Sequence, residues 1–487
     1  MKNVFLPAWL ISGVLVGLAH PLCLDVPTGF LMWFGFVPLL LGLRSGLSFR
    51  GYLIRTYLFS LTEVCFSGFF VAYSGFLNFV VSNLSQSVLV MMGFLVHWFF
   101  LKQFGWRRSL LALPFIWTVA EWVKHVLPHD FQVCPIAYSQ VSVLWFAQMA
   151  DILGVWGISF WLVLVNVSVA LTVDSMGKWK MESGKWETVS HGVGNSLVFI
   201  SCRLFFRKWG IQGIMLFGLP LFYAWWSYIN LPNGRTVEVA LVQTNEDSYA
   251  KLDSIGFNQR IDRVIHLANE AAKGQPDLIV LPESAIPVPI LQNPLAFKMV
   301  RYYVDSWNAA LVVGFVDYPD STNRKRLYNS AMVFTPQLAR EWDSLGAVIS
   351  DLKVYRKQNP MPVMEYMPYV DWLGWDHVLG LNGMTVLKGD EAHVFSFADH
   401  FENEVKTSAT ICWEQMFPET QAGLTEKGAQ FLCQMNNDGW FGQSVGPALL
   451  LNMNRMRAIE NRRSIARASN TGISTFIDAF EIGRAHV

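Results

Sequence analysis

Cys412 is the residue of this chain best suited to covalent chemistry. It follows the β-type run at 407–411 and opens an acidic turn, an order typical of a nucleophile at the tip of a strand. A free thiol has a pKa of about 8.5 and is mostly protonated at neutral pH. The thiol therefore needs a base within hydrogen-bond reach and positive charge nearby, and with both it could attack an acyl carbon.

Glu283 and Lys357 have the side chains that such a thiol requires, a carboxylate base and an ammonium group. Glu283 follows the apolar run at 278–281 and a proline that ends the strand, and Lys357 follows another extended stretch at 354–356. We expect Glu283 to act as the general base. We expect Lys357 to favour the thiolate and then to stabilise the oxyanion, together with a backbone amide near Trp413. The three groups form one site if their strands are neighbours in one sheet.

Each of the three residues also has a purely structural explanation. A single cysteine in a strand is usually a small core residue. Glu283 is compatible with a polar strand end, and Lys357 stands beside Arg356 in a basic stretch that could simply be solvated. Their joint occurrence, in this order and with these flanking residues, favours the catalytic hypothesis.

The second half of the chain, residues 231–487, must position these groups. It alternates β-type runs with polar, helix-compatible segments, which predicts an α/β domain. Cys433 is expected to lie in the packed core, and six cysteines in a chain of this length predict no disulfide framework. The basic stretch 455–467 predicts a surface helix and no nucleic-acid partner. The predicted strands are 237–243, 278–281, 310–315, 330–334, 405–412, 429–435 and 473–477, and the predicted helices are 257–273 and 446–465.

The first half, residues 1–230, has the composition of a membrane domain. The chain of 487 residues is 52% hydrophobic and 15% charged, which is too apolar for a soluble protein of this size. Residues 1–230 hold 14 of the 37 Lys and Arg residues and 8 of the 37 Asp and Glu residues. The remainder carries 23 basic and 29 acidic residues, so a membrane domain precedes a mildly acidic soluble one.

Apolar runs in the first half predict about seven transmembrane helices, since one crossing takes about 20 residues. Lys and Arg residues fall in alternate loops, with Lys124 alone on the other side, so the positive-inside rule places the N-terminus in the cytoplasm. Seven crossings then place residues 231–487 outside the cytoplasm. The predicted spans lie near 4–20, 29–44, 52–77, 86–104, 109–127, 144–173 and 209–230.

Several motifs resemble the Glu-Lys-Cys signature of the nitrilase superfamily. The chain is most similar to its membrane-bound branch, the apolipoprotein N-acyltransferase family, because Glu365 stands eight residues after the lysine and the whole membrane half precedes. The resemblance implies the nitrilase α-β-β-α sandwich. The motifs are Leu-Pro-Glu-Ser at 281–284, Tyr-Arg-Lys at 355–357, Ile-Cys-Trp-Glu at 411–414, Asn-Asp-Gly-Trp-Phe-Gly at 437–442, and the closing stretches 457–463 and 467–474.

The resemblance implies an enzyme of the bacterial inner membrane whose catalytic domain faces the periplasm. Cys412 would take an acyl chain from a phospholipid as a thioester, and the α-amine of the diacylglyceryl-cysteine of an apolipoprotein would then accept it. Exclusion of water at a lipid-facing entrance would favour transfer over hydrolysis. No cofactor, no metal and no nucleic acid is expected, and the protein is expected to act as a monomer.

Five further residues receive secondary roles. Glu365 is expected to orient the lysine or to shuttle protons, and Trp413 is expected to support the nucleophile. Glu414 is either functional, as the resemblance implies, or a plain turn carboxylate. Trp440 and Phe441 could line the acyl route, although an aromatic pair after a glycine turn is as often plain packing.

The chain departs from the family pattern at several positions, and its end is unusual. Val363 and Met364 replace a Phe-Gly pair, and Leu450 stands where a histidine is common. These changes affect lipid and acceptor handling more than the three reactive groups. Residues 481–487 are interpreted as a foreign tail, so that the final membrane helix of the family is expected to be missing.

Two other functions remain open at this level. A membrane-anchored nitrilase-type amidohydrolase would act on a small amide and would need no phospholipid. A transporter is disfavoured, because acidic residues within the predicted spans are few: Glu63, Glu121 and Asp151.

Overall fold

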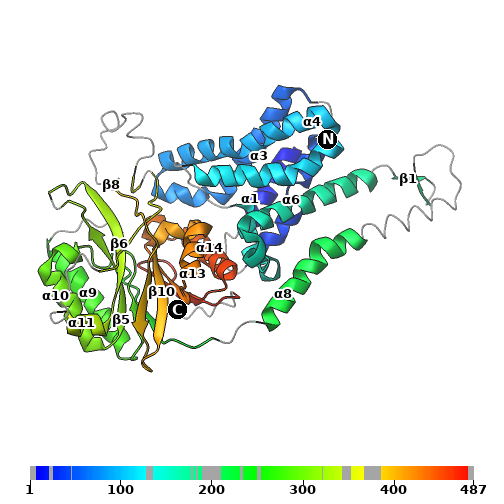
Figure 1. The fold of residues 1–487 in the computed structure, drawn as a ribbon. Helices are drawn as coiled ribbons and strands as arrows, with labels where there is room; N and C mark the ends of the chain where they lie inside the picture. Colours follow the sequence, from blue (N-terminus) through cyan, green and yellow to red (C-terminus); the bar gives the residue numbers. More distant parts are fainter. Residues whose placement is uncertain are drawn as a thin grey trace. The chain divides into compact units, whose positions relative to one another are not determined.

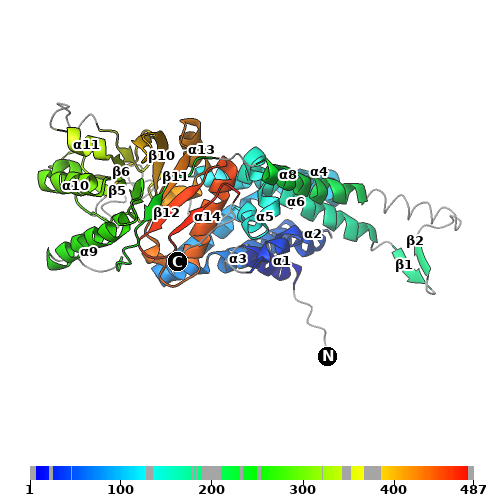
Figure 2. The same ribbon diagram turned by 90° about the horizontal axis from the view of Figure 1, so that it is seen from below.

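The computed structural model divides the chain into two compact units (Figures 1 and 2). The helical unit comprises Met1–Leu127 and Gln132–Leu231, and the catalytic unit comprises Pro128–Phe131 and Pro232–Val487. The expected tail at 481–487 and Val363 lie outside the described residues. The structure describes residues 7–20, 26–44, 47–127, 135–176, 179–182, 185–188, 210–230, 234–248, 254–320, 322–342, 352–362, 364–366 and 385–480.

Among its described residues, the helical unit contains two helices that are long and apolar enough to cross a membrane, Asn78–Val126 and Ala150–Ser175. Two shorter apolar helical segments cover Ala8–Ala19 and Thr28–Gly42. The count of seven spans stays a prediction. The elements in order are α1 (Ala8–Ala19), η1 (Thr28–Trp33), α2 (Val37–Gly42), α3 (Phe49–Ser67), η2 (Phe69–Ser74), α4 (Phe76–Val126), η3 (Ile136–Ser142), α5 (Leu144–Ala147), α6 (Ala150–Met176), β1 (Trp179–Glu182), β2 (Lys185–Thr188), η4 (Ile214–Gly218) and α8 (Leu219–Ile229).

Glycines shape the packing and the breaks of these helices. Gly13 and Gly17 of α1 face α3, where an added Cβ would lie 2.6 Å from the Cβ of Thr62 and 2.4 Å from the Cβ of Phe66. The small residues thus let two apolar helices approach closely. Gly105 has φ 73° and ψ 167°, which interrupts α4 near the predicted boundary between two spans.

The acidic side chains inside the helical unit have polar partners. Glu63 lies 3.4 Å from His20 Nε2 and accepts a hydrogen bond from Ser67 Oγ at 3.3 Å. Glu121 accepts from the backbone N–H of Ile136 at 3.0 Å, and Asp151 accepts from the Tyr223 hydroxyl at 2.6 Å. Such pairing offsets the cost of placing carboxylates among apolar helices.

The catalytic unit contains two facing sheets. In the first sheet the strand order is β3-β4-β5-β6-β7, with β8 beside β6, and in the second it is β13-β12-β11-β10-β9. The first sheet comprises β3 (Val239–Leu241), β4 (Leu278–Val280), β5 (Ala310–Asp317), β6 (Arg326–Phe334), β7 (Tyr355–Arg356) and β8 (Thr385–Val386). The second comprises β9 (Val394–Ala398), β10 (Glu404–Ile411), β11 (Phe431–Asn436), β12 (Ile465–Ser469) and β13 (Thr475–Ile477).

Helices cover the outer face of each sheet (Figures 1 and 2). One layer is formed by α9 (Ser254–Ala272), α10 (Pro294–Trp307) and α11 (Pro336–Glu341), and the other by α13 (Pro418–Glu426) and α14 (Gly446–Asn461). A single apolar core joins the inner faces, with Val312 and Ala331 from one sheet and Ala409 and Cys433 from the other. The expected α-β-β-α sandwich and the buried position of Cys433 are confirmed.

The predictions for the end of the chain are partly wrong. Helix α14 ends at Asn461, where Arg462 adopts a left-handed conformation with φ 48°, and residues 465–469 form β12 instead of a helical turn. The expected surface helix at 455–467 is also wrong. Arg457 and Arg467 are fully buried, where they pair with Glu460 at 3.0 Å and with Asp438 at 2.8 Å.

Candidate functional site

The three predicted reactive residues follow the ends of three strands. Glu283 lies just beyond β4, Lys357 directly follows β7, and Cys412 directly follows β10 as the first residue of η7 (Cys412–Met416). The three strands are not neighbours in one sheet, which was the condition stated for a single site. Strands β4 and β7 belong to the first sheet, where β5 and β6 separate them, and β10 belongs to the second. The site joins strand ends from two facing sheets.

Lys357 is the centre of the cluster. Its side chain is 1% exposed, and its ammonium lies 2.9 and 2.8 Å from the two carboxylate oxygens of Glu365 and 3.6 Å from Glu283 Oε1. Glu365 is held in turn by the backbone N–H of Met361 at 2.6 Å. A buried cation that is shared by two carboxylates has little freedom to move, so its direction is set before any substrate binds.

Asn329 is a site residue that sequence reasoning missed. It lies on β6, and its Nδ2 donates to Glu283 Oε1 at 2.9 Å and to Glu365 Oε1 at 3.2 Å. The backbone carbonyl of Asn329 also accepts a hydrogen bond from the backbone N–H of Lys357 at 2.8 Å. Asn329 thus fixes the spacing between both carboxylates and the lysine. No signal near 329 pointed to this role, because it arises only from the pairing of β6 with β7.

Cys412 has an unusual backbone conformation. Its φ is +49°, a left-handed value that a non-glycine residue keeps only where surrounding contacts enforce it. Gln434 supplies one such contact, since its Nε2 donates to the Cys412 carbonyl at 3.1 Å while Thr410 Oγ1 donates to its Oε1 at 2.8 Å. The backbone N–H of Asn437 acts to lower the pKa of the thiol. The bond from Gln434 thus helps to hold the backbone of Cys412 in this conformation.

Burial and neighbouring charges raise the pKa values of Glu283, Cys412 and Lys357. Burial raises the pKa of Glu283, against the opposing effects of Lys357 and of hydrogen bonds from Asn329 and the Cys412 thiol. Burial also raises the pKa of Cys412, and Glu283 raises it further, so the lysine does not by itself produce a resting thiolate. Burial alone would lower the pKa of Lys357, but Glu365 and Glu283 outweigh it and raise that pKa.

Glu414 lies deep in the structure and links two parts of the site. Its Oε1 accepts from the Tyr355 hydroxyl at 2.6 Å and from the backbone N–H of Gln358 at 2.7 Å, and its Oε2 accepts from the backbone N–H of Ile411 at 2.8 Å. These bonds tie the segment that carries Lys357 to the strand end that precedes the nucleophile. Burial raises the pKa of Glu414 to about 7.

The loop after β11 closes the site on another side. Asn437 accepts from Ser248 Oγ at 2.7 Å and from Asn470 Nδ2 at 3.0 Å. Asp438 forms a fully buried ion pair with Arg467. Gly472, with φ 96°, approaches so closely that an added Cβ would lie 2.5 Å from Asp438 Oδ2.

The predicted aromatic residues lie beside these elements. Trp413 is buried in η7, and Phe441 is buried at the end of η8 (Asp438–Phe441), whereas Trp440 is half-buried. Burial of Phe441 is compatible with plain packing as well as with an acyl route. Their role in acyl binding stays a prediction.

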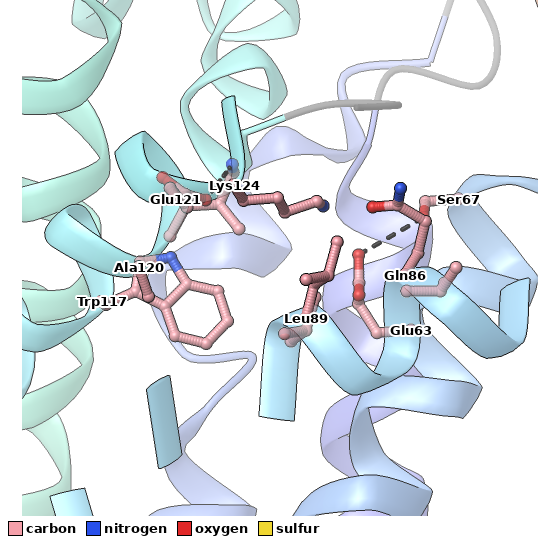
Figure 3. A pocket seen from close by; sticks show the side chains of 11 residues that line it. Glu63, Ser67, Gln86, Leu89, Trp117, Ala120, Glu121 and Lys124 are labelled. Atoms are coloured by element: carbon pink, nitrogen blue, oxygen red, sulfur yellow. Dashed lines mark hydrogen bonds between the residues drawn. The ribbon is translucent and has the colours of Figure 1, made fainter. Parts of the chain in front are cut away.

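The helical unit contains a separate polar cavity of about 40 Å³ (Figure 3). Glu63, Gln86, Glu121 and Lys124 line it together with apolar residues such as Trp117. Figure 3 shows the Lys124 and Gln86 side chains extending toward its middle from two sides. The cavity holds carboxylates and a lysine, as the catalytic unit does, but its lining includes no thiol.

Both halves of the chain match families of known proteins. Residues 12–168 match the apolipoprotein N-acyltransferase N-terminal domain, and residues 238–482 match the carbon-nitrogen hydrolase family. An apolipoprotein N-acyltransferase from Chlorobaculum tepidum is 32% identical over 98% of this chain and 87% of its own length. One from Geobacter metallireducens is 26% identical over 98% of this chain and 85% of its own length.

Solved structures show a weaker likeness. A nitrilase-superfamily amidase from Nesterenkonia AN1 aligns with a TM-score of 0.36 and 19% identity, over 52% of this chain and 87% of the amidase. The assignment depends on the sequence matches, which cover both units. The chain belongs to the apolipoprotein N-acyltransferase family.

Proposed function

We propose that this protein transfers an acyl chain from a phospholipid to the α-amine of the N-terminal diacylglyceryl-cysteine of apolipoproteins, by way of a thioester on Cys412. Membership of the family supports the acyltransferase activity. The observation that supports the residue roles is the buried lysine between Glu283 and Glu365, with the Cys412 thiol near enough to affect the pKa of Glu283.

In the first half-reaction Glu283 takes the thiol proton while the sulfur attacks the ester carbonyl carbon of the phospholipid. The raised pKa of Glu283 makes it a stronger base than an exposed carboxylate, and the thiol lies near enough to affect that pKa. The carbon–oxygen ester bond then breaks, and protonated Glu283 returns the proton to the leaving alkoxide. The products are the thioester and a lysophospholipid.

Lys357 stabilises the negative charge that develops on the carbonyl oxygen. Its pKa is raised by the two carboxylates, so it stays an ammonium throughout the cycle. A charge that is fixed in a buried site stabilises an oxyanion more than one in water, since no solvent must reorganise. Glu365 and Asn329 act on the reaction through the lysine and Glu283, as positioning residues.

In the second half-reaction the α-amine of the acceptor attacks the thioester carbon. Glu283 takes a proton from the attacking amine and passes it to the departing thiolate, which restores Cys412. An amide bond replaces the thioester. The predicted topology, with seven spans and a catalytic unit on the periplasmic side, would bring both lipid substrates to the site from the membrane.

Intact-mass spectrometry of the purified protein, incubated with a defined phospholipid, tests this proposal. We expect a mass gain of one acyl chain, lost in Cys412→Ala and discharged by a synthetic diacylated lipopeptide with formation of the triacylated product. The same lipopeptide with a blocked α-amine is the matched acceptor control. A folded protein that forms no adduct, yet releases free acid from a small amide, would contradict the proposal and favour an amidohydrolase.

A further inference from the structure

Four elements of the helical unit meet at the end of α2, and three arginines gather there. Arg55 on α3 donates from Nη1 to the Gly42 carbonyl at 2.8 Å, and Trp106 donates from Nε1 to the Leu40 carbonyl at 2.9 Å. These bonds satisfy carbonyls that the last turn of a helix leaves free. Arg55 is thereby held at the junction.

Arg44 and Arg107 share one buried carboxylate at the same junction. Asp174, near the end of α6, is 2% exposed and lies 2.5 Å from Arg44 Nη1. It also accepts from Arg107 Nε at 3.0 Å and from Arg107 Nη2. The Arg44 guanidinium lies over the Trp106 ring, 5.8 Å from its centroid. The two guanidinium groups are therefore fixed in position.

The positive charge at this junction exceeds the negative charge. Two guanidinium groups, of Arg44 and Arg107, pair with the one carboxylate, and a third, of Arg55, is bonded to the Gly42 carbonyl. Arg107 Nη1 and Arg44 Nε and Nη2 have no hydrogen-bond partner among the residues that the structure describes, and both side chains are 52% exposed. The junction thus presents oriented donors and two surplus positive charges.

The surface beside these donors is apolar. Leu111, one turn after Arg107 on α4, is 59% exposed, and Phe104, which precedes the break at Gly105, is 51% exposed. A fixed cationic group next to exposed apolar side chains matches the two halves of a lipid, a phosphodiester and its acyl chains. A free anion would use only the first half.

We propose that Arg44, Arg55 and Arg107 bind the phosphodiester headgroup of an anionic phospholipid, whose acyl chains cover the neighbouring apolar surface of α4. This lipid is a bound partner of the helical unit and is separate from the acyl donor at Cys412. Lipid binding at this site needs neither the thiol nor the acyl transfer. It can therefore be tested separately from the proposed function.

Native mass spectrometry of the full chain in detergent tests the site. The probes are phosphatidylglycerol and phosphatidylcholine with identical acyl chains. We expect retention of phosphatidylglycerol well above phosphatidylcholine, and about fivefold weaker retention of phosphatidylglycerol in Arg107→Gln, given about 1 kcal/mol for each basic residue near an anionic lipid. Arg108→Gln is the matched control, because Arg108 is the next residue and is exposed. It should retain the lipid as the unaltered protein does.

A second variant separates lipid binding from folding. Arg107→Gln leaves the buried Asp174 with one partner fewer, so Arg107→Gln/Asp174→Asn removes the excess buried charge as well. We expect this double variant to be folded and to retain less phosphatidylglycerol than the unaltered protein, because it lacks the Arg107 donors although the net charge of the junction is unchanged. Equal retention of the two lipids, or equal losses in the Arg107 and Arg108 variants, would overturn the proposal. So would displacement of phosphatidylglycerol by equimolar inorganic phosphate, which would indicate a simple anion site.

Discussion

Each unit of this protein buries carboxylates near a lysine, but the two groups differ in how the lysine is used. In the catalytic unit the Lys357 ammonium contacts Glu365 at 2.8 Å and Glu283 at 3.6 Å. In the helical unit Lys124 lines a cavity with Glu63 and Glu121, and no ion pair joins Lys124 to either acid within the part of the chain that the structure describes.

The difference shows that burial of charged residues is not enough to make a reactive site. Glu63 and Glu121 have a histidine, a hydroxyl and a backbone N–H as partners, which lowers the cost of burying them, and the lining of their cavity includes no thiol. Glu283 shares its lysine with a second carboxylate, and in the proposed mechanism it receives the thiol proton. Preorganised pairing around a nucleophile is what distinguishes the catalytic cluster.

The strongest test of this comparison is removal of the general base. Glu283→Gln should slow thioester formation by roughly 10²- to 10⁴-fold, because an amide cannot accept the thiol proton. The rate of acyl-enzyme formation by intact-mass spectrometry measures this, with the thermal midpoint as a check on folding. A variant that retains more than a tenth of the rate would exclude Glu283 as the base.

The pH dependence of acylation tests the same residue without a substitution. Burial raises the pKa of Glu283, and the carboxyl must be ionised to accept a proton, so the rate should rise with pH through a midpoint above the usual range for glutamate. Lys357 contributes no step there, since its pKa is raised and it stays charged. A flat profile from pH 5 to 8 would contradict this assignment.

Removal of Asn329 should have an intermediate effect. Asn329→Ala deletes hydrogen bonds to two carboxylates, each worth about 1.5–3 kcal/mol, so we expect acylation to slow by about tenfold or more. Because Asn329 is a positioning residue, the midpoint of the pH profile should also shift upward as Glu283 loses a donor. Slower acylation with an unchanged midpoint would indicate a merely structural role.

Glu414→Gln should affect stability more than chemistry. The new amide must face at least one backbone N–H, at a cost of about 1–3 kcal/mol. Glu414 has a pKa of about 7 when folded, which exceeds the value of about 4.3 for an unfolded chain. The folded state therefore binds the proton of the Glu414 carboxyl more tightly than the unfolded chain does. The stability that this protonated carboxyl contributes is lost as the pH rises through 7. Thermal unfolding between pH 5 and 8 should depend less on pH in the variant.

The smallest effect is expected in the helical unit. Glu63→Gln keeps the shape of the side chain and removes only its charge, so acylation should change by less than about threefold, with a loss of stability of about 1 kcal/mol. This variant is the matched counterpart of Glu283→Gln, since both alter a buried glutamate near a lysine. A comparable loss of acylation would show that the polar cavity takes part in the reaction.

Local sequence was sufficient for seven strands of the two sheets and for the candidate reactive residues, but it missed β8, β9 and β12. Short apolar runs that end in a proline or a polar residue, as before Glu283 and Cys412, correspond to strands β4 and β10. Helix α10 was missed, and the basic stretch after Asn461 was assigned to a surface helix although Arg467 pairs with a buried aspartate. A local pattern cannot report such a pair, because the partner lies 29 residues away.

The sequence by itself determined an apolar half followed by an α/β half, and it singled out a thiol, a carboxylate and an ammonium at strand ends. Only the tertiary structure decided that these groups come from two facing sheets, that Asn329 bridges Glu283 and Glu365, and that Glu414 joins two segments of the site. Strand ends can be recognised from local periodicity, whereas hydrogen bonds between residues far apart in the chain form only when the two sheets pack.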